Sequence, residues 1–134
     1  MPNTQATGVA YADPEFTTCY ASQEIGYSAA AQGVVTQLTS KSTAVTLNKS
    51  SGRITMNAAS LGANSAESFT LNNASISAND TIIVCISGGA TAAAYTTYIS
   101  SLATGSAVIT LRNLTGGALA EAVIINFAII HGAS

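Results

Sequence analysis

The stretch TSKSTAVTLNKSSGRITMN, residues 39–57, alternates apolar and polar side chains and decides the fold. Val45 and Leu47 share one face of an extended segment, and Ile54 and Met56 share one face of the next. A period of two is typical of β-strands that bury one side and expose the other. The stretch therefore predicts two β-strands that follow each other in the chain.

The residues between these strands predict a tight turn. Lys49, Ser50, Ser51 and Gly52 form the junction, and glycine readily adopts the positive φ that a short hairpin turn needs. We therefore expect an antiparallel hairpin here. Lys49 and Arg53 flank its turn, where we expect their charges to keep an exposed strand edge soluble.

Three of the four basic residues lie in this stretch and raise the question of a phosphate or nucleic-acid site. The triplet Lys41-Ser42-Thr43 resembles the end of a Walker loop, but no glycine occurs in VVTQLTS before it, and a strand is expected after it. The sequence therefore excludes a nucleotide site. Four basic residues and a net charge of −2 also argue against a nucleic-acid binder.

Alternation of this kind continues to the end of the chain. Short β-rich segments recur between clusters of Gly, Ser, Thr and Asn, which is typical of an all-β sandwich or barrel. The length of 134 residues suits one such domain. We expect about eight short antiparallel strands. They lie near 33–38, 43–49, 52–57, 66–72, 80–87, 94–102, 106–113 and 121–130.

The last of these segments, 121–130, is apolar on both faces apart from Asn126. A strand covered on both sides is either central in a sandwich or buried by another subunit. Only 7% of the residues are charged, and uncharged polar surface is easier to bury in an interface than charged surface. Because no helix is expected to cover this strand, we predict a subunit interface on it. The candidate interface residues are Val123, Ile125, Phe127 and Ile129.

Residues 1–31 differ from the rest of the chain because their periodicity is weak and their aromatic residues are scattered. We predict an extended, irregular N-terminal arm over 1–31 and a β-sandwich domain over 32–134. Aromatic side chains bury a large area at little cost in conformational entropy, so they are the candidate contacts of the arm with another protein. These aromatic residues are Tyr11, Phe16, Tyr20 and Tyr27.

Few residues in the sequence can build a catalytic or metal site. His131 is the only histidine, and no nucleophile elbow accompanies it. One histidine and two distant cysteines do not make a closed metal site. We therefore expect neither an enzyme nor a cofactor. Cys19 and Cys85 are expected to stay unpaired, with Cys85 buried as a small hydrophobe in its strand.

No membrane-spanning or export segment is expected. The longest apolar run, 122–130, is interrupted by Asn126 and is shorter than the about 20 residues that a spanning helix needs. The N-terminal sequence has neither the basic nor the apolar stretch of a signal peptide. We expect the chain to be made and used in the cytoplasm, or exported only as part of something larger.

Three stretches carry a resemblance to a known family. They are STAVTLNKSSGRITMNAASL (42–61), SFTLNNASISAND (68–80) and LTGGALAEAVIINFAII (114–130). Together they resemble a family of small bacteriophage virion proteins, namely capsid decoration (cement) proteins and head-associated fibre proteins. The similarity extends over residues 35–132, and the arm lies outside it.

The resemblance implies a β-sandwich or jelly-roll that assembles, most often as a trimer, on the outside of an icosahedral phage head. The implied partners are other copies of the chain and the major capsid protein, without nucleic acid or membrane. The implied location is the virion, after synthesis in the cytoplasm of the bacterial host. The arm would then dock on the capsid lattice or on a neighbouring copy.

A host-recognition module of a head fibre or tail, binding a glycan, is the alternative. Jelly-rolls support sugar sites in their loops. Tyr95 and Tyr98, near the loop at Gly88-Gly89, are the candidate side chains to stack on a sugar ring.

Overall fold

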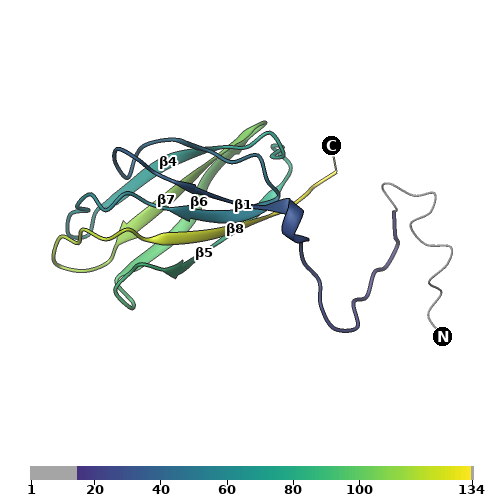
Figure 1. Cartoon of the computed structure of the whole chain (residues 1–134), viewed down its shortest axis with the longest axis horizontal. Helices are drawn as coiled ribbons and strands as arrows, with labels where there is room; N and C mark the ends of the chain where they lie inside the picture. The colour runs from purple at the N-terminus through teal and green to yellow at the C-terminus, as the bar shows by residue number, and fades with distance from the viewer. Residues whose placement is uncertain (1–14, 134) are drawn as a thin grey trace.

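The computed structural model describes residues 15–133, and these residues fold into a β-sandwich that follows one turn of 3-10 helix (Figure 1). The elements are η1 (Ala29–Ala31), β1 (Gln32–Thr36), β2 (Val45–Thr46), β3 (Ser51–Thr55), β4 (Ala66–Asn72), β5 (Thr81–Gly88), β6 (Tyr95–Ala103), β7 (Ser106–Asn113) and β8 (Ile124–Ile130). Each strand falls at one of the eight predicted segments, and only β2 is much shorter than expected. The prediction of an all-β sandwich is confirmed.

The strands form two four-stranded sheets. Sheet A has the order β1-β3-β8-β5, and sheet B has the order β2-β4-β7-β6. From β1 to β6, each strand lies in the sheet opposite to that of the strand before it. As a result β1 pairs with β3 in parallel, and β2 pairs with β4 in parallel, because the strand between them supplies the crossover that parallel pairing requires. The expectation of antiparallel strands is wrong for these two pairs.

The hairpin predicted within 39–57 is wrong for the same reason. Its first half, β2, belongs to sheet B, where Val45 pairs with Leu71, and its second half, β3, belongs to sheet A, where Ile54 pairs with Ile125. Both apolar faces nevertheless point inward, since Val45 and Ile54 are buried. The alternation correctly predicted which side is buried, but not which strand is the partner.

Gly52 lies inside β3 rather than in a turn. A Cβ atom at this position would lie 2.7 Å from the carbonyl oxygen of Gly33 and 2.7 Å from Cδ2 of Leu47. Glycine is required here because the neighbouring strand and the Leu47 side chain approach so closely. A two-residue turn of the expected kind joins β6 to β7 instead, with Gly105 at a φ of 82°.

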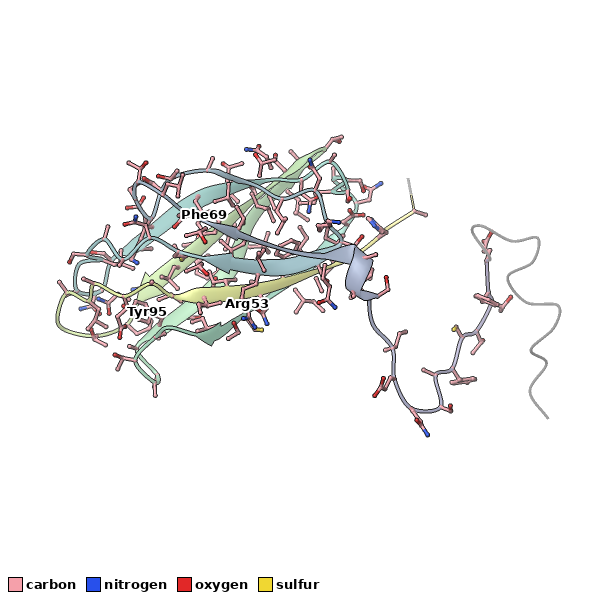
Figure 2. The ribbon with its side chains drawn as sticks, in the orientation of Figure 1. Arg53, Phe69 and Tyr95 are labelled. Atoms are coloured by element: carbon pink, nitrogen blue, oxygen red, sulfur yellow. The ribbon has the colours of Figure 1, made fainter. Side chains whose placement is uncertain are left out.

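The inner faces of the two sheets share one hydrophobic core. Sheet B contributes Phe69 (Figure 2), Ile109 and Leu111, and sheet A contributes Ile54 and the inner face of β8. The predicted interface residues are part of this core. Val123, Ile125, Phe127 and Ile129 are 0%, 0%, 3% and 0% exposed.

The prediction of a subunit interface at these four residues is therefore wrong. Strand β8 is central in sheet A, and sheet B covers its inner face within the same chain. The residues of β8 that alternate with Ile125, Phe127 and Ile129 face away from the core. Of that outward set, Ile130 is 55% exposed.

Candidate functional site

Residues 15–28 form an irregular arm that leads away from the sandwich (Figure 1). Phe16, Tyr20 and Ile25 on this arm are 64%, 92% and 90% exposed. Large apolar side chains gathered on one exposed segment are typical of a surface that another molecule covers. Tyr11, the fourth predicted aromatic contact, lies outside the described residues.

The arm is fixed to sheet A at its root. The hydroxyl of Tyr27 donates a hydrogen bond to the backbone carbonyl of Ile129 in β8. In η1, which follows the arm, the backbone carbonyl of Ala30 accepts a hydrogen bond from Nζ of Lys49 at 3.0 Å. Tyr27 is therefore an anchor within the chain, whereas Phe16 and Tyr20 are free to contact another molecule.

An apolar groove opens at the root of the arm. Its volume is about 520 Å³, and it is lined by Ile25, Gly26, Tyr27, Ile83, Ala128, Ile129, Ile130 and His131. Within it, Ile83 of β5 and Ile130 of β8 are 53% and 55% exposed. We call this the β5–β8 groove. Its lining suits an apolar or aromatic side chain, because solvent contact with these isoleucines is unfavourable.

The outer face of sheet A continues from this groove. Val34, Arg53, Asn126 and Cys85 form one row across the four strands. Nε of Arg53 (labelled in Figure 2) lies 3.4 Å from Oδ1 of Asn126. No carboxylate in residues 15–133 forms an ion pair with Arg53. A second groove of about 310 Å³ lies beside Val34 and Arg53.

Both cysteines are unpaired and exposed. Cys85 lies on the outer face of β5, on the side opposite to the buried Ile82. The prediction that Cys85 is buried is therefore wrong, because the apolar run that contains it covers both faces of an edge strand.

The predicted aromatic pair for a sugar does not form. Tyr95 is buried, whereas Tyr98 is half-exposed on the outer face of sheet B, next to Thr110 of β7. Burial and the nearby charge of Glu121 raise the pKa of Tyr95 to about 12. Because the two rings lie on opposite faces of β6, they cannot stack together on one ligand.

Lys41, the lysine of the Walker-like triplet, is buried and ties three segments together. Its side chain is 3% exposed, and Nζ donates to the carbonyl of Asn57 and, at 2.6 Å, to the carbonyl of Glu121. Burial lowers the pKa of Lys41, and the Glu121 carboxylate opposes that shift. The role of Lys41 is thus internal, and nothing in the sequence distinguishes it from the more exposed Lys49.

Gln37 completes this buried network. Its Nε2 donates to the carbonyls of Lys41 and Thr43, at 3.0 and 2.9 Å, and its Oε1 accepts from the backbone N–H of Asn57 at 3.1 Å. The loop between β1 and β2 is held by polar contacts that alternation alone does not reveal. We call Gln37, Lys41, Asn57 and Glu121 the Lys41 network.

Asp80 binds the end of the chain to the start of β5. Its carboxylate accepts from the N–H of Ser77 at 2.7 Å, the hydroxyl of Ser77 at 2.9 Å and the N–H of Gly132 at 3.1 Å. Nδ1 of His131 lies 3.1 Å from the same carboxylate. These contacts, the Ser77 N–H foremost, lower the pKa of Asp80 to about 2.

We expect stability to fall as the pH drops from about 4 towards 2. Asp80 has an ordinary pKa of 3.8, so over this range the unfolded chain takes up a proton that the folded chain resists. Replacing Asp80 with Asn should flatten this acid limb of a urea-unfolding series. Glu24→Gln, an exposed carboxylate on the arm, is the control and should leave the limb in place. If D80N loses stability between about pH 4 and 2 as steeply as the wild type, Asp80 is not the cause of the acid destabilisation.

Residues 15–133 contain no group of three or more His, Cys, Asp or Glu side chains placed to hold a metal ion. The same residues include no helix that is long and apolar enough to cross a membrane.

Comparison with known proteins gave no match to a protein-family model, to a curated protein or to a solved structure. The resemblance to phage virion proteins therefore stays a prediction from the sequence.

Proposed function

We propose that this chain is a structural virion protein, a capsid decoration protein that binds the outside of a phage head as an oligomer and stabilises the shell. The observation that carries the proposal is the arm, which presents Phe16, Tyr20 and Ile25 to solvent beside a closed sandwich. A chain that hides its core but exposes these side chains is suited to assembly. The sequence resemblance points the same way.

The proposed role needs binding energy rather than chemistry. A protein that binds the mature shell more tightly than any less ordered state shifts the equilibrium towards that shell. Many copies bound side by side would oppose the internal pressure of packaged DNA. The partners are other copies of this chain and the major capsid protein.

A binding assay on heads tests the proposal. The triple variant Phe16→Ser, Tyr20→Ser and Ile25→Ser is mixed with expanded heads that lack this protein, and bound copies are counted after sedimentation. We expect the dissociation constant to rise by about tenfold or more, because aromatic anchors dominate interface energies. Substitution is preferable to deletion of the whole arm, since Tyr27 of the arm donates a hydrogen bond to the Ile129 carbonyl.

The matched control changes three polar positions of the same arm, Thr17, Ser22 and Gln23, to alanine. This variant should bind like the wild type. Wild-type chain that fails to bind heads at all would overturn the decoration role. Undiminished binding by the triple serine variant would instead show that the arm does not contact the head. A few dozen copies or fewer per particle, with binding on a glycan array, would favour the fibre alternative.

A further inference from the structure

We propose that the β5–β8 groove binds the arm of a second copy of this chain, with Phe16 and Tyr20 of one copy against Ile83 and Ile130 of the other. This inference rests on the proposed assembly role of the arm and names its partner. Each copy then supplies side chains that complete the groove of its neighbour.

The two surfaces match in polarity. The groove exposes about half of each isoleucine, Ile83 and Ile130, at a site lined mainly by apolar groups. The arm exposes most of Phe16 and Tyr20, and neither side chain belongs to the hydrophobic core or packs against it. Aromatic side chains that fill apolar grooves are frequent anchors of protein interfaces.

The charges also match. Arg53 is exposed on the outer face of sheet A, next to the groove, and meets no carboxylate within residues 15–133. The described part of the arm carries two charges, both negative, on the exposed Glu15 and Glu24. An arm crossing the outer face of a second copy brings negative charge towards Arg53, which favours this pairing.

The position of the arm favours exchange between copies. Its residues 25–27 form one wall of its own groove, and the residues before them lead away from the sandwich (Figure 1). Extended, residues 16–25 reach up to about 33 Å, which is enough to cross to an adjacent molecule. For Phe16 and Tyr20 to enter the groove of their own chain, the arm would have to fold back over residues 25–27. Because each chain supplies one arm and one β5–β8 groove, exchange around a closed ring of copies leaves no β5–β8 groove unfilled.

The native cysteines report on this contact. Cys19 precedes Tyr20 in the arm, and Cys85 lies two residues from Ile83, about 7 Å along β5. Both thiols are exposed and unpaired. When Tyr20 of one copy occupies the groove of another, a short bismaleimide should join Cys19 of the first copy to Cys85 of the second.

The experiment uses the full chain in solution, without heads. Nitrogen-15-labelled and unlabelled protein are unfolded together, refolded, treated with the bismaleimide, digested and examined by mass spectrometry. We expect Cys19–Cys85 links that join a labelled to an unlabelled peptide. In Phe16→Ser/Tyr20→Ser these links should fall about tenfold. Leu114→Ser changes an exposed apolar side chain away from the groove, and this control should leave the links unchanged.

Two results would overturn the inference. Cys19–Cys85 links confined to peptides of the same label mean that the arm folds onto its own chain. A complete absence of such links, with folded protein, means that the arm docks elsewhere. Either result leaves the decoration role to the head-binding assay. If the wild-type chain forms the mixed-label links but does not bind heads, the decoration role is wrong and the exchange of arms stands.

Discussion

Phe127→Ala is expected to lower the free energy of unfolding by about 3–5 kcal/mol, the usual cost of removing a buried aromatic ring. The ring is 3% exposed in the core, on the central strand of sheet A. Urea unfolding, followed by circular dichroism, measures the loss. Phe16→Ala removes an exposed ring and should change stability by about 0.5 kcal/mol or less.

The same measurement separates a core residue from an interface residue. If Phe127 packs inside its own chain, the loss is the same at every protein concentration. If it packed against another subunit, the apparent loss would vary with concentration, because association contributes to stability by mass action. A loss below about 1 kcal/mol, or one that depends on concentration, would contradict the placement of β8.

Lys41→Met is expected to lower the free energy of unfolding by about 2–4 kcal/mol, because it removes a buried donor from two partly buried carbonyls while keeping a side chain of similar length. These carbonyls belong to Asn57 and Glu121, on segments far apart in the sequence. The matched control is Lys49→Met, which loses one bond to an exposed carbonyl and should cost about 0.5 kcal/mol or less. Equal effects of the two variants would show that the Lys41 network adds no stability.

The strands were predictable from the sequence because their signal is local. Alternation such as that of Ile54 and Met56 depends only on which side of a strand is buried. The pairing was not predictable, because β2 and β3 each pair with a distant strand, and no residue between them specifies the sheet. Gly52 shows the difficulty: glycine suits a turn and a close backbone approach equally well, and only the neighbouring strand decides between them.

The candidate site was predictable in part. The aromatic residues of the arm stood out because they lie outside any periodic pattern. The wrong face of β8 was chosen because both of its faces are apolar, so that burial by sheet B could not be told from burial by a second subunit. The β5–β8 groove needs Ile83 and Ile130 side by side, and that neighbourhood exists only once β5 pairs with β8.

The central position of β8 also determines when sheet A can be completed during synthesis of the chain. Strands β3 and β5 do not touch each other in sheet A, because β8 lies between them: β3 pairs with β1 on one edge and with β8 on the other, and β5 pairs with β8 alone among the strands of this sheet. During synthesis, the edges of β3 and β5 that face β8 therefore stay unpaired until β8 has left the ribosome. Folding that depends on pairings between strands far apart in the sequence is slow, and its intermediates expose hydrophobic surface and unpaired strand edges. Because only 7% of the residues are charged, like-charge repulsion does little to keep such intermediates apart, and the partly synthesised chain is prone to aggregate.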